Sequence, residues 1–291
     1  MRVWSLALAV ALSIAARAEV PKSPEPAHTP DAGAPSAPAA GSPAAAPPPA
    51  VPAPAPAPPP AAAAPAPTSA TAAVAAPAPR ALPPIPAGLG RIAGKITLAG
   101  LAPKLPPIPV GKDMKTCGTS KPDEALEVGP GGGVKNALLW ALDGPPPSKG
   151  SKPRARISLL ACQFTPHVVA IAVGGELLLV NEDPVFHNAT ATGEHAFNYA
   201  MPIKGHTIPS KVKKAGISKL ESKSHPWMKA WLHALPTTAS VVTEADGTWY
   251  LDLPPGPHQI KLWHERLGER EDKIEVEADK TVIRDMALTP R

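Results

Sequence analysis

A long proline- and alanine-rich stretch, residues 19–87, decides how much of this chain can fold. It holds 23 of the chain's 43 prolines and consists almost wholly of Ala, Pro, Ser and Thr. Proline removes a backbone donor and fixes φ, so alternating Ala-Pro sequence favours an extended, solvated polyproline II conformation over a packed core. We therefore predict a disordered tether here, and we prefer a spacer role over a docking ligand for a partner.

The segment before the tether has the pattern of a secretory signal peptide. Arg2 precedes an apolar run at 3–16, and the small-x-small triplet at 16–18 predicts a signal peptide of residues 1–18 with cleavage before Glu19. The run is too short for a membrane span, and no cysteine near the cut could carry a lipid. We expect an exported protein, periplasmic or secreted, with no membrane span.

The remaining residues, 88–291, are long enough for one substantial domain or for two small intertwined ones, and a single core is the simpler expectation. Short runs rich in Val, Ile, Leu and Trp alternate with turn signals such as the glycine pair at 174–175. This spacing predicts an all-β fold, a Greek-key antiparallel β-sandwich. The predicted strands are 91–98, 134–142, 157–162, 168–173, 177–181, 227–235, 247–253, 258–263 and 281–288.

Two stretches lack strand periodicity, 99–130 and 188–224, and loops of that length usually have a function. The second ends in a lysine-rich piece, 211–223, which we interpret as a solvated loop; steering of an acidic partner is the alternative. This piece lacks interleaved aromatic residues, and the formal net charge is only +5. We therefore do not expect nucleic-acid binding.

Three side chains are suited to a soft metal ion. His187 follows a predicted strand at its exit into a turn, and His225 and Met228 stand three residues apart later in the chain. Imidazole and thioether donors together suit copper better than hard cations that prefer oxygen. The sequence therefore predicts a copper site at the end of a small β-protein.

These segments resemble the cupredoxin family, in particular exported plastocyanin-like proteins labelled methylamine-utilization proteins. The resemblance covers about 91–268 and rests on 162–168, Gly174, Asn181, Asp183, His187, Asn188 and the His-Pro-Trp-Met run at 225–228. A later stretch, 243–256 followed by 263–265, is similar to the carboxypeptidase regulatory-like β-module. Its Asp-Gly and Pro-Pro-Gly pieces are turn sequences, so this second likeness concerns fold more than activity.

The resemblance implies copper as the cofactor and His187, His225 and Met228 as three of its ligands. The cupredoxin sequences in question have Cys-x-x-His-Pro-Trp-Met, whereas this chain has Ser222 at the place of the thiolate. A hydroxyl neither binds soft copper strongly nor gives the colour of a copper thiolate. Three outcomes stay open: the site binds copper without the thiolate, another histidine joins it, or the site has decayed on a retained fold.

His233 and His264 are the candidate additional donors, and Glu265 could orient His264 through a hydrogen bond. Sheet packing is the simpler explanation of the Trp-His-Glu run at 263–265. We interpret four further histidines, which lie near turns, as surface residues: His167, His195, His206 and His258.

Cys117 and Cys162 are the only cysteines, and in an exported protein they predict a structural disulfide. The alternative is that Cys162 is a free thiol or a ligand, although it precedes the strand at 168–173 instead of lying in the ligand loop. The spacing alone leaves both open.

The chain has no motif of a serine hydrolase, a phosphate-binding loop or a zinc protease, so we expect no enzyme. The carboxylate pairs Glu182 with Asp183 and Glu265 with Glu269 are explained by solvated loop surfaces. The sequence predicts an exported copper-binding protein in electron transfer or copper handling, with a periplasmic redox or copper-handling protein as partner. The alternatives are an interaction or carbohydrate-binding β-module without metal, and a copper oxidoreductase, which would need an open coordination position.

Overall fold

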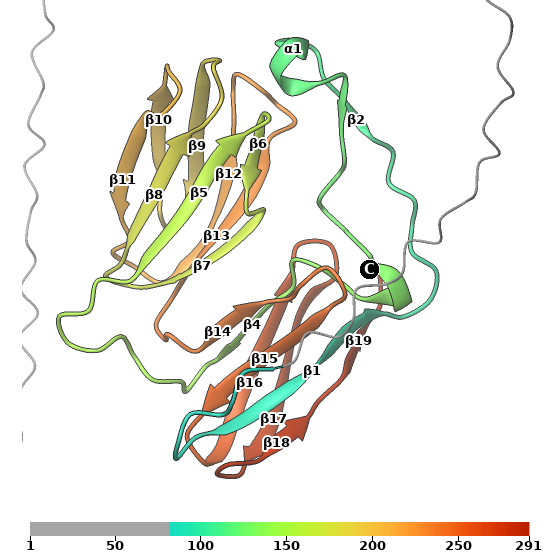
Figure 1. Ribbon diagram of the computed structural model, residues 1–291, viewed down its shortest axis with the longest axis vertical. Coiled ribbons are helices and arrows are strands. Elements are labelled where there is room, and N and C mark those ends of the chain that lie inside the picture. Colours follow the sequence, from blue (N-terminus) through green and yellow to red (C-terminus); the bar gives the residue numbers. More distant parts are fainter. Residues whose placement is uncertain (1–81, 291) are drawn as a thin grey trace, which may run out of the picture. The chain divides into compact units, whose positions relative to one another are not determined.

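The computed structural model describes residues 82–290, and they form an all-β fold of several sheets, which confirms the predicted fold class (Figure 1). The predicted signal peptide and residues 19–81 of the predicted tether lie outside the described residues. Within the described part the one α-helix is α1 (Met114–Cys117), and a 3-10 turn, η1, spans Pro130–Gly132. Between residues 82 and 290 no helix combines the length and the apolar character needed to cross a membrane.

A first β-sandwich is formed by residues 154–235. One layer has the strand order β11-β8-β5-β6 and the other β10-β9-β12-β13-β7 (Figure 1). The bounds are β5 Arg154–Leu160, β6 Gln163–Thr165, β7 Val168–Ala172, β8 Glu176–Asn181, β9 His187–Gly193, β10 Phe197–Met201, β11 Thr207–Lys211, β12 Gly216–Glu221 and β13 Lys229–Leu235. Most neighbours are antiparallel, but β5 and β8 run parallel, as do β7 and β13. These sheets are therefore mixed. Between the two strands of each parallel pair, the chain passes through the other layer, so it can return in the same direction.

The two layers enclose a hydrophobic core. Ile157 and Leu159 on β5 and Leu177 and Leu179 on β8 alternate with residues on the other face and are completely buried. The facing layer contributes Ala189, Ala191, Leu220, Ala230 and Leu232. Because successive strand residues point to opposite faces, every second side chain of these strands reaches the core.

A second β-sandwich is built from chain segments that precede and follow residues 154–235 in the sequence. One sheet has the order β15-β1-β18, with β19 also pairing with β1, and the other has the order β14-β4-β16-β17. The bounds are β1 Gly90–Leu98, β4 Leu138–Ala141, β14 Ser240–Val242, β15 Thr248–Leu253, β16 Gly256–His264, β17 Gly268–Val276, β18 Thr281–Ile283 and β19 Met286–Leu288. The chain leaves this sandwich after β4 and returns to it at β14.

The second sandwich has its own buried cluster, which includes Ile92, Ile96, Leu251 and Leu262. The expectation of a single core is therefore wrong. The strand predicted at 91–98 exists, but it belongs to the second sandwich and not to the strands around the predicted copper ligands. Those strands come from 154–235, a narrower range than the 91–268 of the resemblance. The stretch 243–256 and the run 263–265 lie in the second sandwich.

A third, smaller cluster joins side chains of the two sandwiches. Its buried members are Leu138, Trp140, Val168, Leu235 and Trp263. They come from β4 and β16 of the second sandwich and from β7 and β13 of the first.

His167 lies between the sandwiches and is only 6% exposed, so its interpretation as a surface histidine is wrong. Its Nε2 lies 2.8 Å from a Glu265 carboxylate oxygen, and its Nδ1 lies 3.1 Å from the Lys229 carbonyl oxygen. Both partners are acceptors, so the imidazole donates from both nitrogens. Burial opposes the charged form, but Glu265 and Glu124 outweigh it and raise the pKa of His167 above its ordinary value.

The stretch 188–224 is not an irregular loop, because it contains most of β9 and all of β10, β11 and β12. The strand pattern is weak because the inward positions carry small or polar residues, such as Ala189 and Ala191 on β9 and Ser218 on β12. The lysine-rich piece 211–223 likewise is not a solvated loop, since β12 pairs with both β9 and β13.

The other stretch, 99–130, is irregular for most of its length, as expected. It contains α1 and two short strands that pair with each other, β2 (Ile108–Pro109) and β3 (Ser120–Lys121). This long connection carries Cys117 and Asp113, and both matter for the candidate site.

The placement of β12 in the sandwich is tested by Leu220→Ala. Leu220 is completely buried, and truncation of a buried leucine costs about 2–5 kcal/mol of the free energy of unfolding. Urea denaturation measures this loss. Leu101→Ala is the matched control, since Leu101 is 95% exposed and its truncation should change the free energy by less than about 0.5 kcal/mol. Equal, small effects of the two substitutions would contradict the buried position of β12.

Candidate metal centre

The turn between β5 and β6 forms one wall of the candidate site. Its two central residues, Ala161 and Cys162, have φ of 49° and 56°, the left-handed region that a two-residue type I′ hairpin turn requires. The Asp183 carboxylate accepts the N–H of Ala161 at 2.8 Å and the N–H of Cys162 at 2.7 Å. One buried carboxylate therefore holds both amides of the turn.

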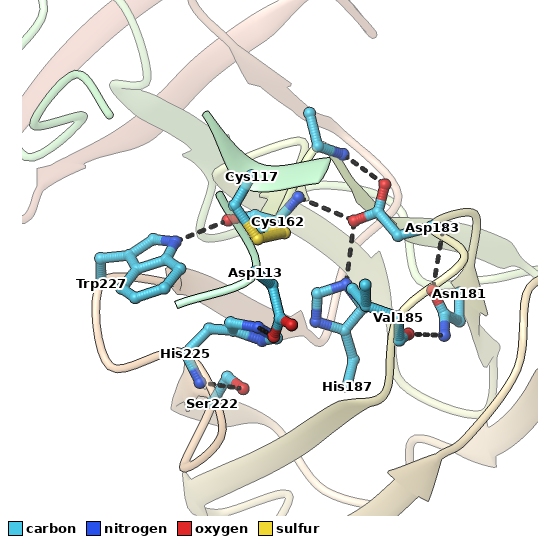
Figure 2. The surroundings of a disulfide bond; sticks show 11 residues. Asp113, Cys117, Cys162, Asn181, Asp183, Val185, His187, Ser222, His225 and Trp227 are labelled. Carbon is cyan, nitrogen blue, oxygen red and sulfur yellow. Dashed lines mark hydrogen bonds and ion pairs between the residues drawn. A yellow bond between two sulfur atoms is a disulfide. The ribbon is translucent and has the colours of Figure 1, made fainter. Parts of the chain in front are cut away.

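Asp183 also orients His187, the first residue of β9. The distance from His187 Nε2 to Asp183 Oδ2 is 2.9 Å (Figure 2). Asn181 fixes the loop between them: its side-chain oxygen accepts the Asp183 N–H at 2.9 Å, and its amide donates to the Val185 and Met201 carbonyls. His187 thus starts a paired strand and does not lie in a free loop.

His225 reaches the same place from the turn between β12 and β13. Its Nε2 lies 2.9 Å from Asp113 Oδ2, and its backbone N–H donates to Ser222 Oγ at 3.2 Å. Asp113 is the N-cap residue of α1, yet its side chain makes no capping bond and instead contacts His225. The indole of Trp227 covers His225, with ring centroids 5.1 Å apart.

A disulfide between Cys117 and Cys162 attaches α1 to the β5–β6 turn, with an S–S distance of 2.01 Å. Figure 2 shows the two sulfurs beside Asp113 and the imidazoles. Trp227 Nε1 donates to the Cys162 carbonyl at 3.1 Å, which fixes the same turn from the other side. The disulfide therefore belongs to the wall of the site.

The two imidazoles of the site face each other. Their centroids are 4.7 Å apart, at an interplanar angle of 56°. Both rings are 0% exposed, and the Nδ1 atom of each is buried without a hydrogen-bond partner. Each Nε2 lies beside a carboxylate, which only accepts, so Nε2 carries the proton of the neutral ring and Nδ1 carries a free lone pair.

This arrangement fits a metal ion with nitrogen donors. Ligating histidines in proteins commonly donate their other N–H to a carboxylate, as His187 does to Asp183 and His225 does to Asp113. Burial lowers the pKa of His187, against the opposing effect of its hydrogen bond to Asp183. The ring therefore stays in its neutral form, which is the form that binds metals.

The other two predicted site residues lie in the turn that follows β12. Met228 donates its N–H to the His225 carbonyl at 2.9 Å, and its side chain is 1% exposed within the first hydrophobic core. Ser222 is 3% exposed, and its hydroxyl accepts the His225 N–H. The structure thus brings His187 and His225 together, with Ser222 beside His225 and Met228 in the same turn.

His233 and His264 do not join this site. The His233 ring packs against the indoles of Trp263 and Trp140, with centroids 4.3 Å and 6.2 Å apart. His264 Nδ1 accepts the backbone N–H of Arg266. Burial lowers the pKa of both histidines to about 4. Their proposed role as additional donors is wrong, because both are packing residues of the sheets.

Sequence reasoning missed two carboxylates of the site. Asp183 is 3% exposed, so its assignment to a solvated surface is wrong, whereas its neighbour Glu182 does bond to Ser158 and Arg156 on the outside of the sheet. The signal for Asp183 was its place four residues before His187. Asp113 gave no local signal, because its partner His225 lies 112 residues later.

The comparisons with known proteins return cupredoxins, and only among solved structures. No protein-family model matches the chain, and no curated protein matches it. A copper-containing nitrite reductase from Thermus scotoductus SA-01 is 23% identical, with a TM-score of 0.27, over 31% of this chain and 25% of that one. A purple cupredoxin from Nitrosopumilus maritimus is 22% identical, with a TM-score of 0.25, over 28% of this chain and 98% of that one.

A Cu(I) form of an amicyanin mutant is 13% identical, with a TM-score of 0.26, over 33% of this chain and 97% of that one. This chain spans a quarter of the length of the nitrite reductase. The likeness to a carboxypeptidase regulatory-like module finds no counterpart among these matches and stays a prediction. With TM-scores this low, the chemistry has to be argued from the residues of the site itself.

Replacing Asp183 by asparagine tests its central position. A hydrogen bond to a charged group contributes about 1.5–3 kcal/mol, and an asparagine amide would face one of the three donors with an N–H of its own. We expect Asp183→Asn to lower the free energy of unfolding by about 2–3 kcal/mol in urea denaturation.

Asp143→Asn is the matched control for that substitution. Asp143 also accepts from a histidine and a backbone amide, His258 Nδ1 and the N–H of Gln259, each at 3.1 Å, but its side chain is 46% exposed. Its replacement should cost less than about 1 kcal/mol. Equal losses from the two substitutions would show that Asp183 has no special structural role.

Proposed function

We propose that this protein binds one copper ion through Nδ1 of His187 and Nδ1 of His225, with the thioether of Met228 as a third donor. The observation that carries the proposal is the pair of buried Nδ1 atoms without a hydrogen-bond partner, on two imidazoles whose ring centroids lie 4.7 Å apart. A buried polar atom without a partner is costly and rare in folded proteins. A bound metal ion removes that cost.

The donor set favours the cuprous ion and a role in copper handling. Thioether and imidazole are donors that suit Cu(I), and in the disulfide state no thiolate is available to form a blue-copper electron-transfer centre. When bound, copper can carry one electron by cycling between Cu(I) and Cu(II). The residues of the site do the rest: Asp183 and Asp113 orient the imidazoles, and Trp227 keeps water away from His225.

The biological setting is part of the same proposal. The signal-peptide pattern at 1–18 supports export to the periplasm or beyond, where a redox or copper-handling protein would be the partner. We propose a binding protein and not an enzyme, because both imidazoles are 0% exposed and a substrate would need an open position.

The copper proposal is tested by anaerobic titration of the chain from Glu19 onward with Cu(I) against a calibrated chelator. The wild type should bind one equivalent, and His187→Ala or His225→Ala should abolish that binding, since each removes one of two buried nitrogen donors. Circular dichroism checks that the fold persists in both variants.

His258→Ala is the control, because both ring nitrogens of His258 already have partners, Asp143 and the Pro254 carbonyl. It should leave copper binding unchanged. Equal loss in all three variants would sink the assignment of ligands. A wild type that never competes with the chelator would favour the alternative, an interaction or carbohydrate-binding module with a decayed site.

Ser222→Cys tests whether the position of the missing thiolate is retained. The Ser222 hydroxyl is buried and accepts the N–H of His225, and a thiolate sulfur at that place can accept the same bond. The Cu(II)-loaded variant should show the intense visible absorption of a copper thiolate, which the wild type lacks. A variant that binds copper but stays colourless would place residue 222 away from the metal.

A further inference from the structure

The disulfide lies within reach of the copper ligands, and this position has consequences for the chemistry of the site. Among the described residues, two groups gather potential metal-binding atoms within 4.8 Å of one another: Cys117, Cys162 and His225, and Cys162, Asp183 and His187. Cys162 belongs to both groups. Its sulfur is therefore close to a ring nitrogen of each histidine in the proposed site.

Donor atoms that share one metal ion at bond lengths of about 2.0–2.3 Å lie at most about 4.6 Å apart. Cys162 lies within 4.8 Å of a ligand atom of His225 in one group and of a ligand atom of His187 in the other, so side-chain rotations would have to bring the three donors to one ion. In the disulfide, however, the sulfur of Cys162 is bonded to Cys117 and cannot act as a thiolate.

The two cysteines are held in different ways. The Cys162 backbone is fixed by bonds that do not involve sulfur, its N–H to Asp183 and its carbonyl to Trp227. Cys117 ends the four-residue helix α1, on the long irregular connection 99–130. Breaking the S–S bond would therefore leave Cys162 beside the imidazoles, while Cys117 and α1 lose their covalent attachment to the β5–β6 turn.

We propose that the Cys117–Cys162 disulfide is a redox switch for copper affinity, and that its reduction supplies Cys162 as the thiolate ligand that position 222 lacks. This inference rests on the proposed copper site. The oxidised protein offers two imidazoles and a thioether. The reduced protein offers the same donors together with the anionic sulfur of Cys162, which binds soft copper more strongly.

The reductant is a dithiol, either a small molecule or a thiol–disulfide oxidoreductase. The S–S bond between Cys117 and Cys162 breaks while an S–S bond forms in the dithiol, and two electrons and two protons pass to the two cysteine sulfurs. Cys162 then gives up its S–H proton to solvent when it binds copper. Both cysteines are buried in the oxidised state, so attack on the disulfide requires α1 to lift. Met114, at the start of α1, is 57% exposed, so a movement of this short helix would expose little further apolar surface.

A matched pair of variants of the chain from Glu19 onward, Cys117→Ser and Cys162→Ser, tests the switch. Each loses the same disulfide and the stability that it contributes, but only Cys117→Ser retains a thiol at position 162. Cu(I) affinity is measured anaerobically by competition with a calibrated chelator. We expect Cys117→Ser to bind Cu(I) at least about 10-fold more tightly than either Cys162→Ser or the oxidised wild type. The dithiol-reduced and desalted wild type should match Cys117→Ser.

Alkylation of the thiols gives a second readout. In Cys117→Ser, Cu(I) should protect Cys162 from iodoacetamide, as seen by mass spectrometry, and His187→Ala in that background should remove both the protection and the gain in affinity. Equal affinities of the two serine variants, with one equivalent still bound by the oxidised wild type, would overturn the switch and leave the copper site intact. No binding in any redox state would overturn the copper site itself. If the Cys117→Ser variant still bound Cu(I) tightly after His187→Ala, the gain in affinity would come from the thiol of Cys162 alone. That result would overturn the switch.

Discussion

The Asp183 carboxylate is the interaction on which the geometry of the site depends. A buried charge is expensive unless its hydrogen bonds are satisfied, and here three donors from two segments supply them: the amides of Ala161 and Cys162 and the ring of His187. Non-glycine residues in the left-handed region cost roughly 1–2 kcal/mol each. The same carboxylate therefore offsets the strain of the turn, and in doing so sets where the Cys162 sulfur lies relative to His187.

The two imidazoles are paired with carboxylates in similar ways, but the two supports differ in rigidity. Asp183 is 3% exposed and lies within the first sandwich, so His187 is fixed by the core itself. Asp113 has a side chain that is 39% exposed, on a connection that reaches the site through α1 and the disulfide. His187 is thus oriented by a carboxylate of the first sandwich, whereas the carboxylate that orients His225 lies on a segment that the Cys117–Cys162 disulfide attaches to that sandwich.

The strands that could be predicted from the sequence are those whose inward positions carry large aliphatic residues, as in β7 and β8. Two of the strands that were not predicted, β9 and β12, face the core with alanine or serine at several positions. Small inward residues suit a sheet that lies opposite bulky leucines, because the sum of the two layers fills the space. This complementarity in side-chain size involves two layers, so the sequence of one strand alone does not reveal it.

The same limit applies to the site. His187, His225 and the turn around Met228 could be found locally, because a ligand and its neighbours follow one another in the chain. The carboxylate that orients His225 lies 112 residues away from it. The closeness of the disulfide to both imidazoles depends on a turn and a helix that only the folded chain brings together.

The second sandwich also contributes to the position of the ligand turn. His167 donates to the carbonyl of Lys229, the residue that follows Met228, and to the Glu265 carboxylate of the other sandwich. Glu265 accepts a further bond from the indole of Trp231 at 2.5 Å. Burial alone would raise the pKa of Glu265, but its hydrogen bonds to His167 and Trp231 outweigh burial and lower the pKa, which favours the carboxylate. These hydrogen bonds join β13 and the backbone next to Met228 to the second sandwich, and they thereby restrain the turn that carries His225 and Met228.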